Sequence, residues 1–188
     1  MKSTSASIPD LERMNGIRLE DDIAGRLKEL QGRSEVKDFY YQPVLRYYRE
    51  DVHPDFLVKV PRGYGLEFDV LEAKNWGKSK ALILYSNNVD GLMCQGEDAD
   101  EIITQMYKYD LGTMYEKALS TLKKGKLIIV TTAPLYIAKN GQPASETEVL
   151  RIPLTTRNMN SKMEPVLSKS TFYIVSFAYF KDNYPSLA

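Results

Sequence analysis

Residues 55–74 read DFLVKVPRGYGLEFDVLEAK, and this stretch decides the fold. Its two ends, residues 55–60 and 66–74, are rich in the apolar and β-branched residues that favour strands. Residues 61–65 (PRGYG) lie between them and contain the proline and glycines typical of a turn. Two strands joined by a short turn most simply form an antiparallel hairpin, which we expect here.

Helical and strand-like segments surround this hairpin. Residues 10–31 carry apolar side chains at helical spacing, and we expect that helix to end near Gly32. Residues 36–48 are aromatic and β-branched and predict a strand bent at Pro43. The other expected elements are a buried strand at 81–86, a loop at 87–96, a helix from Asp98 to about Lys123, a strand at 126–132, a peripheral hairpin within 134–170, which contains Asn140-Gly141, and a last strand at 172–180.

This order of elements predicts an α/β fold with a mixed central sheet flanked by helices. A length of 188 residues suits a single domain. We expect that domain to span residues 10–188, with a core at about 16–132 and accessory strands at 134–188. Residues 1–9 (MKSTSASIP) predict a disordered N-terminal arm.

Composition excludes several classes of protein. The chain has 25 Lys+Arg against 25 Asp+Glu, so nucleic-acid binding would need a local basic face. The single cysteine, Cys94, excludes an intrachain disulfide and a cysteine-rich metal site, and fits a reducing compartment. The longest apolar stretch, residues 172–180, is far shorter than the roughly 20 residues of a membrane helix. We therefore expect an intracellular protein without a membrane partner, in the cytoplasm, or in a host cell's cytoplasm if the chain is viral.

Three charged side chains gather near one end of the predicted hairpin. Strand alternation places Glu72 and Lys74 on the face of Phe68 and Val70, and Asp55 opens the partner strand within reach of them. Carboxylate oxygens that converge in this way suit Mg²⁺. The alternatives are an ordinary cross-strand ion pair for Glu72 and Lys74, and an ordinary turn entry for Pro54-Asp55.

Glu20 occupies an inconvenient place on the first helix. It precedes Ile23 by three residues and Leu27 by seven, which puts a carboxylate on the apolar stripe. A buried isolated charge is costly unless it is paired or bound to a cation. The alternative is that Glu20 lies at the edge of the stripe and reaches solvent.

Taken in chain order, these features resemble the PD-(D/E)XK nuclease superfamily over about residues 16–132. Pro54-Asp55 and Glu72-Ala73-Lys74 match the signature of that superfamily. Residues 16–24 (GIRLEDDIA) are similar to the first-helix segment of the archaeal Holliday-junction resolvase and RecB-like branches, and residues 105–109 (QMYKY) are similar to the Gln-x-x-x-Tyr motif of the RecB-like branch. Helical spacing places Gln105 and Tyr109 on one face, although a surface glutamine and a core tyrosine would satisfy the same spacing.

The resemblance implies a restriction-endonuclease-like core in the order αβββαβ and a Mg²⁺- or Mn²⁺-dependent DNA nuclease that hydrolyses phosphodiester bonds. Such an enzyme would act in recombination, repair or replication, with branched or single-stranded DNA as structure-specific substrates, and resolvase-like members form homodimers. By the same resemblance, the catalytic residues would be Asp55, Glu72, Lys74 and Glu20. The metal ligands would be Asp55, Glu72 and the carbonyl of Ala73, and Glu20 would hold a metal-bound water or a second ion. Gln105 and Tyr109 would contact DNA or order the site. Lys74 would position or activate the attacking water.

The chain departs from the family pattern in its histidines and offers a second aspartate. The first helix lacks the metal-binding histidine that RecB-like nucleases often carry. His53 is the one histidine of the chain, and we expect it to pack or to face DNA rather than to bind metal. Asp69 is also a candidate ligand, but its strand parity opposes that of Glu72, so Asp55 is preferred.

Basic and aromatic residues just beyond the site suggest a substrate surface. Trp76 and Lys78 follow Lys74 closely and combine a stacking ring with positive charge. The alternative is a tryptophan packed in the core beside solvated lysines. Lys123, Lys124 and Lys126 are expected at the C-terminus of the long helix, where the helix dipole favours cations.

The sequence also fits two other functions. One is a catalytically silent DNA-binding or assembly module on the same fold. The other is a structural or partner-binding protein, because the 13 tyrosines of the chain suit interfaces.

Overall fold

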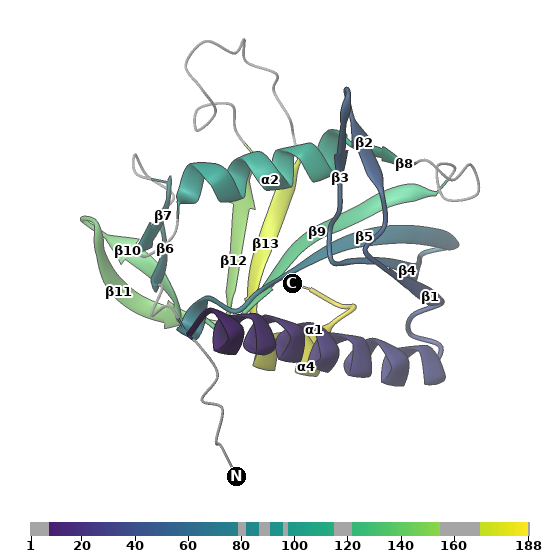
Figure 1. Cartoon of the computed structure of the whole chain (residues 1–188), viewed down its shortest axis with the longest axis horizontal. Coiled ribbons are helices and arrows are strands. Elements are labelled where there is room, and N and C mark those ends of the chain that lie inside the picture. Colours follow the sequence, from purple (N-terminus) through teal and green to yellow (C-terminus); the bar gives the residue numbers. More distant parts are fainter. Residues whose placement is uncertain are drawn as a thin grey trace.

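The structure is a computed structural model, and it describes residues 8–78, 82–86, 91–95, 98–114, 122–154 and 170–187. A mixed six-stranded sheet lies between helix α2 (Ala99–Leu111) on one face and helices α1 (Ile8–Gly32) and α4 (Phe177–Asn183) on the other (Figure 1). The expected α/β class with a mixed central sheet flanked by helices is therefore confirmed.

The central sheet combines an antiparallel meander with two parallel pairings. The strands run in the order β1-β4-β5-β9-β13-β12, with bounds β1 Asp38–Tyr41, β4 Phe56–Arg62, β5 Gly65–Lys74, β9 Lys123–Thr131, β13 Thr171–Ser176 and β12 Val149–Pro153. Strands β5 and β9 pair in parallel, as do β9 and β13. The expected hairpin is confirmed as β4 and β5, and its turn uses Gly63 at φ +60°, which glycine adopts without strain.

The sheet is buried on both faces, and strand β5 shows how its residues divide between them. Phe68 and Val70 pack into the core under α2, whereas Leu71 packs into the core under α1. The predicted alternation is thus confirmed. It places Glu72 on the α2 face and Asp69 on the α1 face, although only three residues separate them in the chain.

Helix α1 is one continuous helix from Ile8 to Gly32, and it ends where the sequence predicted. Its buried stripe consists of Leu19, Ile23, Leu27 and Leu30. The expected disordered arm is wrong for Ile8 and Pro9, because proline is well tolerated in the first turn of a helix. Residues 1–7 lie outside the described part of the chain.

The strand predicted at 36–48 is divided at Pro43 between two sheets. Strand β1 belongs to the central sheet, while β2 (Leu45–Tyr47) pairs with β3 (Glu50–Val52) and β8 (Thr113–Met114) in a three-stranded sheet. Proline has no amide hydrogen to donate to a ladder, so the break falls there.

A second small sheet has the order β11-β10-β6-β7, with β6 Leu82–Ser86, β7 Gly91–Gln95, β10 Leu135–Lys139 and β11 Gln142–Thr147. The peripheral hairpin expected within 134–170 is confirmed, and its turn lies at Asn140-Gly141, with both residues at positive φ. The loop expected at 87–96 is wrong at residues 91–95, which form a strand through pairing with β6.

Helix α2 is shorter than predicted, because it ends at Leu111 rather than near Lys123. Its C-cap is Gly112, where a Cβ would lie 2.8 Å from the Lys108 carbonyl oxygen and 3.0 Å from the Leu45 Cβ. Close packing against β2 therefore requires glycine and turns the chain into β8. Residues 115–121 lie outside the described part of the chain.

The lysines expected at the end of that helix belong to strand β9 instead. The Lys124 ammonium nevertheless contacts a helix C-terminus, because it donates hydrogen bonds to three carbonyls at the end of α2, those of Tyr109, Asp110 and Gly112. The interaction follows the helix dipole, as expected, but it connects two separate elements.

The last predicted strand, at 172–180, is correct only in its first half. Strand β13 ends at Ser176, whose side chain accepts a hydrogen bond from the Tyr179 amide (3.1 Å) and begins α4. This N-cap lies inside an apolar run, which hid the change from strand to helix.

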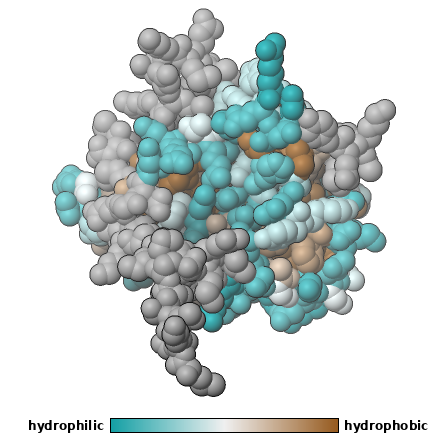
Figure 2. Space-filling model, viewed as in Figure 1, coloured by the Kyte–Doolittle hydropathy of each residue, from teal (hydrophilic) through white to brown (hydrophobic). Residues whose placement is uncertain are grey.

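No helix among the described residues is long and apolar enough to cross a membrane. On the face of the molecule seen in Figure 2, the described surface is mostly hydrophilic, and hydrophobic side chains show only in small separate areas.

Candidate active site

Two carboxylates face each other at the end of the β4–β5 hairpin. The register pairs Phe56 with Leu71, so continuing it by one residue places Asp55 opposite Glu72. Asp55 accepts a hydrogen bond on Oδ2 from the Ala73 amide (2.7 Å). In an extended strand the N–H and C=O of one residue face the same neighbouring strand, so the Ala73 carbonyl also faces the Asp55 side.

This carboxylate pair is electrostatically strained. The pKa of Asp55 is raised to about 8: burial is the largest cause, the nearby charges of Glu72 and Glu20 also raise it, and the hydrogen bond from the Ala73 amide lowers it. Burial also raises the pKa of Glu72, against the lowering effects of Lys74 and Tyr109. The site thus brings together more negative charge than its surroundings neutralise, which is common at catalytic and metal-binding sites.

The Lys74 ammonium lies beside the pair. Its Nζ is 3.7 Å from Oε1 of Glu72, and its side chain is about a quarter exposed, whereas the Glu72 side chain is largely buried. Lys74 therefore links the buried carboxylate to the accessible surface. The structure brings Asp55, Glu72 and Lys74 together as the sequence predicted.

Helix α2 supplies two further groups, which form a chain of hydrogen bonds to Glu72. The Tyr109 hydroxyl donates to Oε2 of Glu72 (2.7 Å), and Nε2 of Gln105 donates to the Tyr109 oxygen (3.1 Å). Burial and the Glu72 carboxylate raise the pKa of Tyr109, which therefore stays a neutral donor. The two residues share one helix face, as their spacing predicted, and they hold Glu72 in place.

Glu20 approaches the pair from α1. It lies at the edge of the buried stripe and is half-buried, so the edge alternative describes its position. Its carboxylate accepts a hydrogen bond from the Tyr41 hydroxyl and interacts with Asp55, so it is also paired. The hydrogen bond to Glu20 raises the pKa of Tyr41 to about 12.

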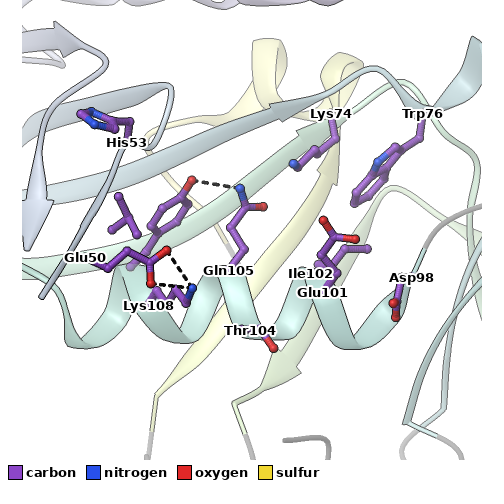
Figure 3. A pocket seen from close by; sticks show the side chains of 12 residues that line it. Glu50, His53, Lys74, Trp76, Asp98, Glu101, Ile102, Thr104, Gln105 and Lys108 are labelled. Atoms are coloured by element: carbon purple, nitrogen blue, oxygen red, sulfur yellow. Dashed lines mark hydrogen bonds and ion pairs between the residues drawn. The ribbon is translucent and has the colours of Figure 1, made fainter. Parts of the chain in front are cut away.

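A pocket of about 450 Å³ lies next to this site, between helix α2 and the end of β5 (Figure 3). Lys74 and Tyr109, which contact Glu72, line it together with Gln105, whereas Asp55 and Glu72 themselves do not line it. Its other charged lining residues are Glu50, Asp98, Glu101 and Lys108. The Lys108 ammonium contacts both carboxylate oxygens of Glu50 (3.0 and 2.8 Å), and this pair joins α2 to β3 at the pocket wall.

The aromatic and basic residues beyond Lys74 contribute unequally to this pocket. Trp76 lines it but is 95% buried in the core, so the core alternative describes most of its ring. The side chain of Lys78 lies outside the described part of the chain. His53 is exposed at the pocket wall, away from the carboxylate pair's hydrogen bonds.

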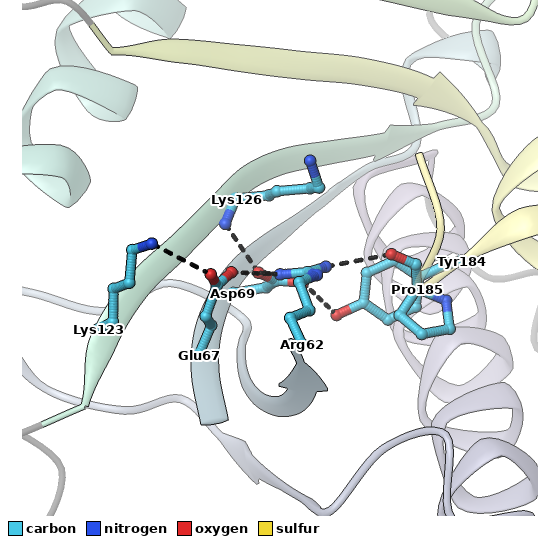
Figure 4. Close-up of polar contacts among 7 residues, drawn as sticks. All are labelled: Arg62, Glu67, Asp69, Lys123, Lys126, Tyr184 and Pro185. Carbon is cyan, nitrogen blue, oxygen red and sulfur yellow. Dashed lines mark hydrogen bonds and ion pairs between the residues drawn. The ribbon is translucent and has the colours of Figure 1, made fainter. Parts of the chain in front are cut away.

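Asp69 lies on the opposite face of β5 and is fully buried there (Figure 4). Arg62 donates to both of its oxygens (2.5 and 2.7 Å), the Lys126 amide donates to one (2.7 Å) and the Tyr184 hydroxyl to the other (2.8 Å). Every oxygen of Asp69 is therefore occupied by protein donors, which leaves it no part in the pocket.

The donor set of the site fits a hard divalent cation of the Mg²⁺ type. Among the described residues, no group of three or more His, Cys, Asp or Glu side chains is arranged to hold a metal. Mg²⁺, however, is commonly bound by one or two carboxylates with waters completing its shell. Asp55 and Glu72, with raised pKa values and a facing backbone carbonyl, match that smaller requirement.

Comparisons of the chain with protein-family models, with curated proteins and with solved structures find no match.

Some residues of the site were not expected from the sequence. Tyr41 contacts Glu20 across the fold, and Glu50 and Lys108 close the pocket wall. Lys108 lies three residues after Gln105 on the same helix, so its place on the pocket face could have been predicted. Tyr41 and Glu50 carry no such local signal, because tertiary contacts bring them to the site.

Proposed function

We propose that this protein is a Mg²⁺- or Mn²⁺-dependent DNA nuclease with a restriction-endonuclease-like core. The observation that carries the proposal is the facing pair of carboxylates, half-buried Asp55 just before β4 and buried Glu72 on β5, with the Lys74 ammonium 3.7 Å from Glu72. The order of α1, the meander β1-β4-β5, α2 and β9 also agrees with the αβββαβ order of that core.

The residues that would hold the metal are Asp55 and Glu72, completed by the Ala73 carbonyl. A bound divalent cation supplies positive charge for a phosphodiester and for an attacking water. It would also lower the cost of two facing carboxylates, because a nearby cation stabilises their ionised forms. The raised pKa of Asp55 is thus what such a site shows without its cation.

The remaining groups act on position and charge. Lys74 reaches from Glu72 into the pocket, so its ammonium can orient the attacking water or stabilise the charge that develops on the phosphate. Tyr109 and Gln105 hold Glu72 in its orientation. Glu20 would add a carboxylate beside Asp55, for a bound water or a second ion.

The test is a nuclease assay on branched, single-stranded and duplex DNA with Mg²⁺ or Mn²⁺. We expect cleavage by the unmodified protein, and a loss of about 10²–10⁴-fold in rate for Glu72→Gln and for Lys74→Ala, with DNA binding retained. Glu67→Gln is the matched control, because Glu67 is a carboxylate of the same strand that pairs with Arg62 instead of facing the pocket. It should cleave like the unmodified protein.

The outcomes separate the candidate functions. Cleavage that survives both Glu72→Gln and Lys74→Ala would remove these residues from the active site. DNA binding without cleavage of any substrate would replace the proposal by a silent DNA-binding or assembly module. A homodimer stays a prediction, which sedimentation of the full chain tests directly.

A further inference from the structure

The tip of the β2–β3 hairpin carries an exposed aromatic residue, Tyr48, at a backbone position that does not suit it. Tyr48 follows β2 in the two-residue turn that joins Tyr47 to Glu50. Its φ is +53°, a left-handed conformation that glycine or asparagine adopts far more easily than tyrosine. Its side chain is 81% exposed, so core packing does not compensate for the strain.

A pocket of about 310 Å³ lies beside this ring, lined by Arg46, Tyr47, Tyr48, Leu111 and Thr113. This volume is at the small end of the range of ligand sites, about 300–1,000 Å³. The rings of Tyr47 and Tyr48 meet edge to face, with centroids 4.8 Å apart and planes at 87°. The two perpendicular rings and the Leu111 side chain form a corner, called here the Tyr47–Tyr48 corner, that suits one flat aromatic group.

The two walls of this corner differ in rigidity. Two contacts hold the Tyr47 ring. It meets the Tyr107 ring edge to face, with centroids 6.3 Å apart, and the Lys108 ammonium lies over it, 6.0 Å from its centroid. The backbone of Tyr48 is held by Arg46, whose Nε donates to the Tyr48 carbonyl (3.0 Å). The Tyr48 turn is therefore fixed, while its ring presents a face to solvent.

This corner lies next to the candidate active site. The hairpin that ends in Tyr48 also contributes Glu50 and Val52 to the 450 Å³ pocket. Lys108 lines that pocket and contacts Tyr47 as well, so one wall separates the two pockets. Arg49, exposed at the same tip, adds a positive charge where a phosphate would pass.

We propose that the Tyr47–Tyr48 corner binds an unpaired nucleobase of single-stranded DNA, next to the strand segment that enters the candidate active site. The inference rests on the proposed nuclease function and names its substrate class. Every base has a face that can stack on an aromatic ring, so such a site prefers single strands without reading their sequence. Paired bases in a duplex do not offer that face.

The experiment measures DNA binding of the full chain in EDTA, which separates binding from metal-dependent cleavage. The probes are a fluorescein-labelled 20-nucleotide oligo(dT) and a duplex of the same length, at one fixed salt concentration. We expect Tyr48→Gly to weaken binding of the single strand by about fivefold or more, because stacking contributes about 1–3 kcal/mol per base, and to leave duplex binding unchanged. Tyr48→Phe should keep the affinity of the unmodified protein.

Two controls address folding and general surface effects. Glycine suits the φ of Tyr48, so Tyr48→Gly should unfold at the same temperature as the unmodified protein or higher. Tyr64→Ser removes a fully exposed tyrosine from the other hairpin tip, between β4 and β5, and should bind both probes normally.

Three results would overturn the inference: equal single-strand affinity of Tyr48→Gly and the unmodified protein, an equal loss for both probes, or no binding of the single strand by the unmodified protein. If Tyr48-dependent binding is found but Mg²⁺ or Mn²⁺ produces no cleavage, the proposed reaction fails and the nucleobase site stands. If cleavage is found without Tyr48-dependent binding, the proposed reaction stands and the nucleobase site fails.

Discussion

Strand β5 carries a buried carboxylate on each face of the central sheet, and the two have opposite surroundings. Asp69, on the α1 face, accepts hydrogen bonds from a bidentate arginine, a tyrosine hydroxyl and a backbone amide. Glu72, on the α2 face, accepts from the Tyr109 hydroxyl, lies 3.7 Å from Lys74 and faces a second carboxylate, Asp55.

The difference separates a carboxylate whose oxygens are all occupied by protein donors from one that faces a second carboxylate. Both are nearly inaccessible, so burial alone does not separate them. The Asp69 network also ties the C-terminal segment to the sheet, because Arg62 donates to the Pro185 carbonyl (3.1 Å) as well. The Glu72 site leaves its charge incompletely neutralised beside a pocket, which is the arrangement expected where a cation and substrate enter.

The largest contrast in stability should come from breaking the Arg62–Asp69 pair. Arg62→Met leaves Asp69 as a buried charge without its cation, and we expect the free energy of unfolding to fall by about 3–5 kcal/mol. Glu72→Gln should leave this free energy unchanged or raise it, because it removes a carboxylate whose burial is costly. Urea unfolding followed by circular dichroism at pH 7 measures both. Equal losses in the two variants would contradict the distinction.

The next contrast is the pH dependence of stability in EDTA. Because the pKa of Asp55 is about 8 in the folded protein and about 3.9 in the unfolded chain, the folded state binds the additional proton between these values. The free energy of unfolding should therefore fall as the pH rises through that window, by up to about 1.4 kcal/mol per pH unit. Asp55→Asn should remove this component. Parallel pH curves for the two proteins would contradict the shift.

The two carboxylates can also be compared through their tyrosines, because Asp69 accepts a hydrogen bond from the Tyr184 hydroxyl and Glu72 accepts one from the Tyr109 hydroxyl. Tyr184→Phe should lower the free energy of unfolding by about 1–2 kcal/mol and leave cleavage unchanged. Tyr109→Phe removes a hydrogen bond that lowers the pKa of Glu72, so the acidic limb of the pH–rate profile should move to higher pH. The outcome that counts against the contrast is a shifted pH–rate profile in Tyr184→Phe.

The smallest expected effect is stabilisation by Mg²⁺. At a free concentration of ten times Kd, binding to the folded state should raise the free energy of unfolding by about 1.4 kcal/mol. Thermal unfolding with and without Mg²⁺ measures this gain. It should vanish in Asp55→Asn and persist in Glu67→Gln, whose carboxylate pairs with Arg62 (3.2 Å). A gain that persists in Asp55→Asn would place the bound ion elsewhere.

Local periodicity was enough to predict several parts of the fold. Alternation along residues 66–74 placed Glu72 and Asp69 on opposite faces, and helical spacing placed Gln105 beside Tyr109. These predictions succeeded because the direction of a side chain follows from its own segment. The same local logic overextended α2, since it did not include the contact between Gly112 and Leu45.

The sequence by itself determined the β4–β5 hairpin and the order of α1, β1, β4, β5, α2 and β9, but it placed β12 and β13 among accessory strands although both belong to the central sheet. Only the tertiary structure decided that Tyr41 donates to Glu20, that the Lys124 ammonium contacts the carbonyls at the end of α2, and that Tyr184 donates to Asp69 from 115 positions further along the chain. The physical reason is that the cost of a buried charge depends on its neighbours in space. A sequence shows where a carboxylate is buried, and the fold decides which groups surround it.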